Sequence, residues 1–123
     1  MDRKIKVMIV EDHPVNLKLA RDILELDGFE VYACMDAESA QECLREVHPD
    51  MILMDVALPG LDGLELTRIL KADEKTKDIK IVALTAFAMK TDKDRVMEAG
   101  CDGYITKPIS TRKFTEQILE LLK

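Results

Sequence analysis

The chain has 123 residues, of which 47% are hydrophobic and 34% are charged, and its formal net charge is -6. This length and composition predict one folded globular domain over residues 1–123 rather than a disordered chain. The acidic balance disfavours binding to nucleic acid and to anionic membranes, because both need clustered lysine and arginine. No apolar run approaches a membrane span and no signal-peptide core follows Met1, so we expect a cytoplasmic protein without membrane insertion.

The cysteines form no recognisable motif. Cys34, Cys43 and Cys101 are odd in number, show no Cys-x-x-Cys spacing, and have no histidine at the spacing of a zinc finger. We therefore expect three reduced thiols in or near the core.

Short apolar runs alternate with helical patterns along the chain. A continuous apolar run predicts a strand buried on both faces, and apolar residues every three or four positions predict a helix. Strands are predicted at residues 6–10, 30–34, 51–55, 80–85 and 103–106. Helices are predicted from Pro14 to a C-cap at Gly28, along a stripe from Ala37 to Val47, and around residues 66–70, 96–97 and 114–122.

Five strands that alternate with five helices predict a flavodoxin-like, doubly wound parallel sheet of order 2-1-3-4-5. The six-stranded dinucleotide-binding order fits less well, because only five strands are present. In the 2-1-3-4-5 order the first and third strands are neighbours, and functional residues gather at their carboxyl ends.

Three carboxylates should meet at that edge. Glu11 and Asp12 follow the first strand, and Asp55 ends the third. Two carboxylates about 4 Å apart repel by about 4 kcal/mol at an effective dielectric of 20, so the group needs a cation or a proton. Hard oxygen ligands that fill only some of the coordination positions of a metal favour Mg²⁺, with Mn²⁺ as the alternative ion. A carboxylate beside such an ion can attack phosphorus and form an aspartyl phosphate.

Two more polar residues reach the same edge. Lys107 follows the fifth strand and could hold a phosphoryl oxygen as a point charge. Thr85 ends the fourth strand, where its hydroxyl could donate a hydrogen bond to phosphate. Taken singly, Lys107 could be a solvated charge and Thr85 a β-branched strand end. Their arrival at the same edge as the three carboxylates favours a phosphate site.

These motifs, in this order, resemble the receiver domain of two-component response regulators over essentially the whole chain. The resemblance rests on Glu11-Asp12, on Asp55 with the segment 58–63, on Thr85-Ala86, and on Tyr104 with Lys107-Pro108. It implies that Asp55 is the phosphoacceptor and takes a phosphoryl group from a histidine of a sensor histidine kinase or phosphotransfer protein. It also implies a signalling protein that catalyses only its own phosphorylation and dephosphorylation.

The resemblance assigns roles to the other residues of the site. Glu11, Asp12, Asp55 and the backbone carbonyl of Ala57 would hold the metal. Lys107 would pair with the phosphoryl group, and the peptide bond to Pro108 would be cis, an isomer that proline tolerates.

Thr85 and Tyr104 resemble the switch pair of the family. On phosphorylation Thr85 would move toward Asp55 and Tyr104 would swing inward, which changes the face made by helix 4, strand 5 and helix 5. No DNA-binding domain follows Lys123, so we expect this face to act on a downstream protein, from a monomer or weak dimer.

A finer resemblance links the chain to small single-domain regulators of bacterial cell division and cell fate. It rests on Asn16, on the segment Thr85-Ala86-Phe87-Ala88-Met89-Lys90, and on Lys107-Pro108-Ile109-Ser110. His13 should lie beside the acidic residues, where surface capping is favoured over a catalytic role.

Three other functions stay open. A flavin or nucleotide binder would need amides that cradle phosphate, whereas the loop Glu11-Asp12-His13-Pro14 repels it. A magnesium-dependent phosphohydrolase would want an acid near its nucleophile, but Val56 and Ala57 follow Asp55. A receiver-like binding module that is never phosphorylated would not need the intact set of polar residues.

Two positions predict a long-lived phosphoryl group. Ala57 brings no polar side chain to orient an attacking water, and Phe87 is large and apolar enough to screen the site. We therefore expect slow self-dephosphorylation, measured as loss of phosphate from purified protein in the presence of magnesium. A half-life of seconds that Phe87→Glu leaves unchanged would contradict this expectation.

Overall fold

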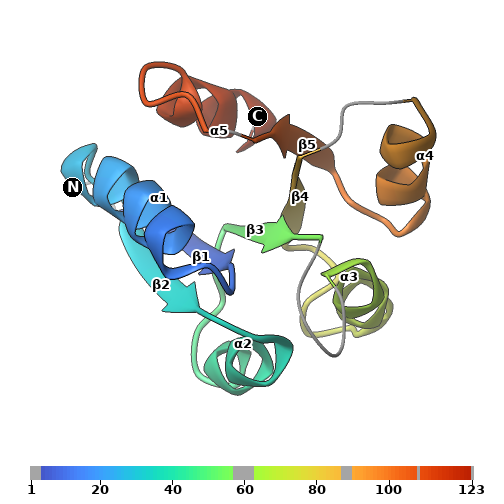
Figure 1. Cartoon of the computed structure of the whole chain (residues 1–123). Coiled ribbons are helices and arrows are strands. Elements are labelled where there is room, and N and C mark those ends of the chain that lie inside the picture. The colour runs from blue at the N-terminus through green and yellow to red at the C-terminus, as the bar shows by residue number, and fades with distance from the viewer. Residues whose placement is uncertain (1–3, 57–62, 87–89, 108, 123) are drawn as a thin grey trace.

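The computed structural model describes residues 4–56, 63–86, 90–107 and 109–122, with only the backbone for residues 90–92 (Figure 1). Strands and helices alternate from the first element to the last. The elements are β1 Lys6–Val10, α1 Pro14–Leu26, β2 Glu30–Cys34, α2 Ala37–Leu44, β3 Met51–Asp55, α3 Gly63–Ala72, β4 Lys80–Thr85, α4 Lys90–Glu98, β5 Gly103–Thr106 and α5 Phe114–Leu122. In the described part of the chain, none of the helices has the length and apolar character needed to cross a bilayer.

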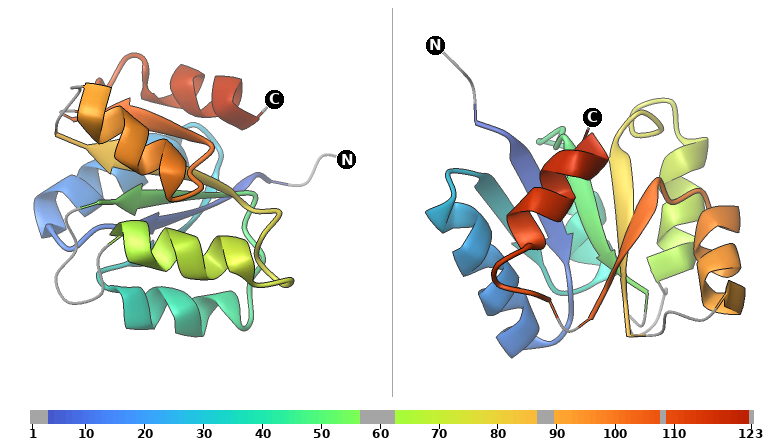
Figure 2. Two further views of the ribbon diagram at one scale, coloured as in Figure 1. Left: turned by 90° about the vertical axis from the view of Figure 1, so that its right-hand side faces the viewer. Right: turned by 90° about the horizontal axis from the view of Figure 1, so that it is seen from above.

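The sheet has the predicted topology. Its five strands are all parallel and lie in the order β2-β1-β3-β4-β5. Parallel neighbours require crossover connections, and the helices supply them on both faces of the sheet (Figure 2). The switch point of the order therefore falls between β1 and β3, as the sequence indicated.

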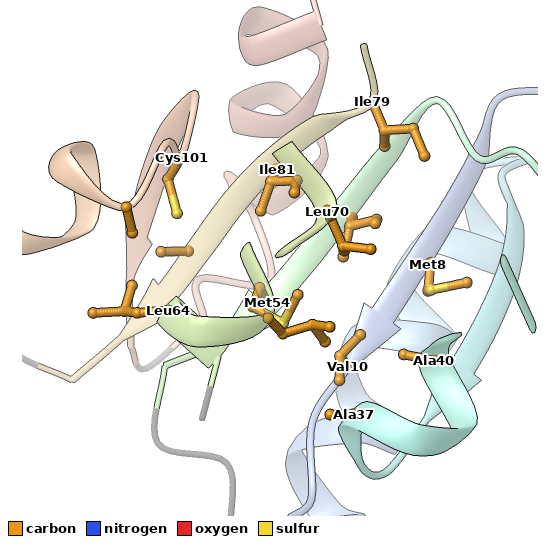
Figure 3. Packing of buried hydrophobic residues seen from close by; sticks show 14 of the residues in the cluster. Met8, Val10, Ala37, Ala40, Met54, Leu64, Leu70, Ile79, Ile81 and Cys101 are labelled. Carbon is orange, nitrogen blue, oxygen red and sulfur yellow. The ribbon is translucent and has the colours of Figure 1, made fainter. Parts of the chain in front are cut away.

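Two hydrophobic layers hold the sheet between its helices. The side chains of a strand alternate between its faces, so each strand contributes to both layers. On one face α1 and α5 pack over a layer that includes Ile9, Leu53 and Phe114. On the other face α2, α3 and α4 cover a layer that includes Met8, Met54 and Ile81 (Figure 3). The central strand β3 is buried along its whole length, which explains its continuous apolar sequence.

The helix boundaries differ from the prediction at the start of α3, which begins at Gly63, and at the end of α2. The predicted stripe from Ala37 to Val47 is too long, because α2 ends at Leu44. The N–H of Glu46 donates to the carbonyl of Cys43, an i→i−3 bond that tightens the last turn. Pro49 then disfavours helical geometry in the residue before it.

Some apolar residues within the predicted helices face solvent. Leu26 is 87% exposed and Met97 is 46% exposed. The buried residues beside them are Leu24 and Val96, and residues one or two positions away on a helix point to a different side. Gly28 does follow α1 with φ +89, the left-handed conformation expected of a glycine just past a helix end.

A partly exposed ion pair lies at the amino ends of β4 and β5. Lys71 Nζ lies 2.8 Å from Asp102 Oδ2 and donates to the carbonyl of Ile79 over 2.8 Å. The same Asp102 oxygen accepts the N–H of Ile81 at 2.8 Å. These contacts connect the segment before β4 with the segment before β5, at the edge opposite the acidic residues.

The start of α3 presses against the end of β3. A Cβ atom at Gly63 would lie 2.2 Å from the backbone oxygen of Asp55 and 3.0 Å from Cγ of Met54. Backbone cannot yield as a flexible side chain does, so only glycine fits here. Gly103 offers a contrast, since the atoms nearest to its Cβ would all belong to the flexible Leu121 side chain, the closest at 2.7 Å.

We expect Gly63→Ala to lower the free energy of unfolding by about 1–3 kcal/mol, the usual effect of overpacking a filled core. Urea denaturation followed by circular dichroism measures this loss. Gly103→Ala is the matched control, and its loss should be the smaller of the two because Leu121 can change rotamer. Equal losses in the two variants would show that the Gly63 contact carries no special constraint.

Candidate functional site

The register of the sheet brings the acidic residues together. Val10 of β1 pairs with Met54 of β3, so the next residues, Glu11 and Asp55, lie side by side where the strands end. Glu11 is 1% exposed and Asp55 is 3% exposed, whereas Asp12 is half-buried. One oxygen from each of the three carboxylates lies within 4.8 Å of the others. The cluster predicted from the sequence therefore exists.

Lys107 is the cation of this cluster. Its Nζ lies 2.9 Å from Glu11 Oε1 and 3.4 Å from Asp55 Oδ1. The backbone positions it, because the N–H of Lys107 donates to the carbonyl of Thr85 over 2.7 Å and so continues the β4–β5 pairing. The sequence placed Lys107 at this edge, but its pairing with Glu11 was not predicted.

The protonation of the cluster follows from burial and charge. Burial raises the pKa of Glu11, and the Asp55 carboxyl beside it raises the pKa further, while Lys107 opposes both effects. Burial alone would lower the pKa of Lys107, but its hydrogen bond to Glu11 and the charge of Asp55 raise it above its ordinary value. The lysine therefore stays charged, and this one ammonium faces the buried carboxyls of both Glu11 and Asp55.

The donor set fits a hard divalent cation. Glu11 Oε2 is buried and accepts no hydrogen bond from the residues that the structure describes. A buried carboxylate oxygen without a partner is costly, and a cation at this edge would satisfy it. Carboxylate oxygens, of which the cluster offers one from each of three residues, are ligands that Mg²⁺ prefers.

Thr85 and Tyr104 occupy the same face of the sheet. Ala83 pairs with Tyr104, and Thr85, two residues further along β4, pairs with Thr106. Thr85 is buried, and Tyr104 is half-buried against the layer under α4. Lys93 of α4 lies over the Tyr104 ring, with its Nζ 5.8 Å from the ring centroid. A cation in this position is attracted to the ring and favours the side-chain orientation seen here.

An open cavity of about 300 Å³ adjoins the acidic cluster. Its lining residues come from α1, from the ends of β4 and β5, and from the segment before α5: Asn16, Leu19, Ala86, Lys107 and Ile109. Leu19 and Val15 expose apolar side chains on the neighbouring surface of α1. The cavity gives a second molecule a path toward Lys107.

Not every predicted residue can be placed. Ala57, Phe87 and Pro108 lie outside the described residues. The metal-binding carbonyl of Ala57, the effect of Ala57 and Phe87 on the lifetime of the phosphoryl group, and the cis bond before Pro108 therefore stay predictions. His13 is exposed at the N-cap position of α1, and its side chain makes no capping hydrogen bond.

The three cysteines are free thiols. Burial is the main cause that raises the pKa of Cys34 to about 12 and that of Cys101 to about 11, so both are protonated at neutral pH.

Sequence reasoning missed three features of the site. Gly63 belongs to the predicted loop 58–63, and its close approach to the Asp55 backbone has no signature in composition or periodicity. Lys93 lies in a helix with few apolar residues, and nothing in that pattern indicates its contact with Tyr104. Leu19 breaks the buried stripe of α1, and this irregularity was the available sign of a functional surface.

Comparison with known proteins agrees with this geometry. The response regulator receiver domain profile matches residues 7–119. The polar-differentiation response regulator DivK of Brucella ovis is 48% identical over 116 residues, which cover 94% of each chain. DivK of Brucella anthropi is 47% identical with the same coverage.

Solved structures show the same fold. The chemotaxis response regulator CheY4 of Vibrio cholerae matches with a TM-score of 0.92 and 22% identity, covering 97% of this chain and 99% of that one. The receiver domain of the sensor histidine kinase PA1611 from Pseudomonas aeruginosa matches with a TM-score of 0.87 and 31% identity, covering 98% of both chains. That structure has a magnesium ion coordinated in its active site cleft. Profile and relatives together cover nearly the whole sequence, and the chain belongs to the response regulator receiver domain family.

Proposed function

We propose that this receiver domain accepts a phosphoryl group on Asp55 and passes the change to a partner protein. The observation that carries the proposal is the position of Asp55, which is buried at a strand end, beside Glu11 and 3.4 Å from the Lys107 ammonium. A carboxylate held next to charges of both signs is placed to attack phosphorus and to have its product stabilised.

Glu11, Asp12 and Asp55 would hold Mg²⁺, with the backbone carbonyl of Ala57 as the further ligand that the family resemblance implies. The unpartnered Glu11 oxygen and the magnesium ion in the Pseudomonas aeruginosa receiver support this assignment. When bound, the ion would neutralise carboxylate and phosphoryl charge.

The chemical step uses residues of this chain in three roles. An Asp55 carboxylate oxygen forms a bond to phosphorus while the bond from phosphorus to the donor histidine nitrogen breaks. Lys107 balances charge on the transferred group, since its ammonium already lies between Glu11 and Asp55. The buried Thr85 at the end of β4 would then donate its hydroxyl to a phosphoryl oxygen.

The surroundings of the site favour a protein donor over a free substrate. The cavity beside Lys107 and the apolar residues Val15 and Leu19 of α1 offer a surface for a histidine kinase or phosphotransfer protein. The output would be the face of α4, β5 and α5, where Lys93 meets Tyr104. The similarity to the polar-differentiation response regulator DivK supports a role in polar differentiation. We propose that the domain acts in the cytoplasm and in the control of cell division.

Incubation with acetyl phosphate and Mg²⁺ tests the proposal directly. Intact-mass spectrometry should find one phosphoryl group on the wild type and none on Asp55→Asn, because the amide is not a nucleophile. Asp78→Asn is the matched control, since Asp78 is an exposed aspartate that pairs with His48; it should be phosphorylated like the wild type. An unmodified wild type would contradict the proposal, and repeated turnover of a small phosphomonoester would instead indicate a phosphohydrolase.

The contact between Lys93 and the Tyr104 ring is predicted to oppose the movement of Tyr104 on activation. Lys93→Met keeps the aliphatic chain but removes a cation–π interaction of about 0.5–1 kcal/mol, which corresponds to roughly two- to fivefold in an equilibrium. If Tyr104 moves on activation, beryllofluoride with Mg²⁺ should bind the variant more tightly by that factor, as measured by nuclear magnetic resonance titration. Lys75→Met, at another exposed lysine, is the control. Unchanged affinity in Lys93→Met would show that the contact does not restrain the switch.

A further inference from the structure

One buried hydroxyl that no step of the proposed reaction uses is hydrogen-bonded to the residue that touches Asp55. Thr67 is 0% exposed, and its Oγ1 donates to the carbonyl oxygen of Gly63 over 2.8 Å. In an α-helix that begins at Gly63 the same carbonyl also accepts the N–H of Thr67. A threonine that bonds back to the carbonyl four residues earlier often bends the helix. The direction in which the first turn of α3 leaves Gly63 therefore depends on this hydroxyl.

A second buried group fixes the orientation of the hydroxyl. Cys101 lies between α4 and β5, in the hydrophobic layer of Figure 3, and is 4% exposed. Its thiol donates to Thr67 Oγ1, with the sulfur 3.9 Å from the oxygen. The hydroxyl proton goes to Gly63, which leaves the oxygen lone pairs to accept the thiol proton. The hydroxyl is thus held between α3 and the segment before β5, where bulk water does not reach it.

Gly63 in turn acts on the peptide group that joins Asp55 to Val56. A Cβ atom at Gly63 would lie 2.2 Å from the Asp55 oxygen, so the two backbones are in contact. The N–H of the same peptide belongs to Val56 and donates to the carbonyl of Leu84 over 3.3 Å. The oxygen and the N–H of a trans peptide point in opposite directions. The peptide is therefore held from both sides, by Leu84 of β4 and by Gly63 of α3.

We propose that Thr67 is a positioning residue for the acidic site, which acts through Gly63 on the backbone of Asp55. The contact between Gly63 and Asp55 also holds together the two ends of the segment that carries Ala57, whose carbonyl the family resemblance implies as a metal ligand. Loss of the hydroxyl would keep the core filled but release the first turn of α3. The effect on Mg²⁺ binding rests on the proposed function, whereas the effect on the backbone does not.

Three variants separate positioning from general stability. Thr67→Val has nearly the same shape as the wild type but no hydroxyl, and Thr67→Ser keeps the hydroxyl. Thr76→Val is the matched control, because Thr76 is also buried and donates to the carbonyl of Leu70 over 2.6 Å, near the other end of α3. Each valine variant removes one buried hydroxyl–carbonyl bond, so urea denaturation should find losses of stability of similar size.

Amide hydrogen exchange of the metal-free protein, followed by nuclear magnetic resonance, tests the positioning without any ligand. In Thr67→Val the N–H of Val56 should exchange several-fold faster relative to that of Leu53, in the buried centre of β3. Thr76→Val and Thr67→Ser should stay close to the wild-type ratio. An unchanged ratio in Thr67→Val, or an equal rise in either of the other variants, would overturn the proposal.

Magnesium titration by calorimetry then tests the consequence for the metal site. Thr67→Val should bind Mg²⁺ about three- to tenfold more weakly than the wild type, since loss of a group bonded directly to a metal ligand costs roughly 10- to 100-fold. Thr76→Val should bind it like the wild type, and Thr67→Ser should recover most of the affinity. Equal affinities in the wild type and Thr67→Val would overturn the connection to the metal site. A wild type that binds no Mg²⁺ would contradict the proposed function, and the exchange ratio would still decide whether Thr67 positions the Asp55 backbone.

Discussion

The repulsion between Glu11 and Asp55 governs the functional edge of this molecule. Parallel pairing of β1 with β3 forces the two carboxyls together, and burial removes the water that would screen them. The Lys107 ammonium neutralises part of that charge. Lys107 follows β5 and reaches Glu11 at the end of β1, although β4 and β3 lie between these two strands. Like charges therefore lie close together at this edge, and a phosphoryl group and a divalent ion together would reduce their repulsion. Such unfavourable electrostatics are typical of sites where function is favoured over stability.

The rest of the fold supplies the rigidity that this edge requires. A buried layer on each face of the sheet fixes the strand ends, and the Lys71–Asp102 pair secures the opposite edge. The close approach of Gly63 to the Asp55 backbone ties the start of α3 to Asp55, the proposed phosphoacceptor. Each of these constraints acts on the backbone, so the reactive side chains are positioned before any partner arrives.

Much of this arrangement was predictable because it follows from strand burial and topology. Continuous apolar runs in β1, β3 and β4 indicate strands buried on both faces, and the 2-1-3-4-5 order then places Glu11 beside Asp55. The end of α2 was mispredicted because Val47 fits the helical period, whereas the local backbone bonds that end the helix leave no mark in that period.

Contacts between side chains from distant elements were harder to predict than the strands. The pairing of Lys107 with Glu11 and the position of Lys93 over Tyr104 depend on how helices and strand ends pack, which hydrophobic periodicity does not report.

The sheet also separates the cavity by which a donor would approach from the α4 part of the proposed output face, whose other helix, α5, lies on the cavity side. The cavity beside Lys107 belongs to the side of α1 and α5, whereas Tyr104 and Lys93 belong to the side of α4. Substitutions on the two sides share few neighbours, so their energetic effects should add rather than interact. Mutations on one side can then change which protein binds there, while the other side keeps its binding partner. Duplicated copies of such a chain can acquire new phosphoryl donors and still bind their original targets.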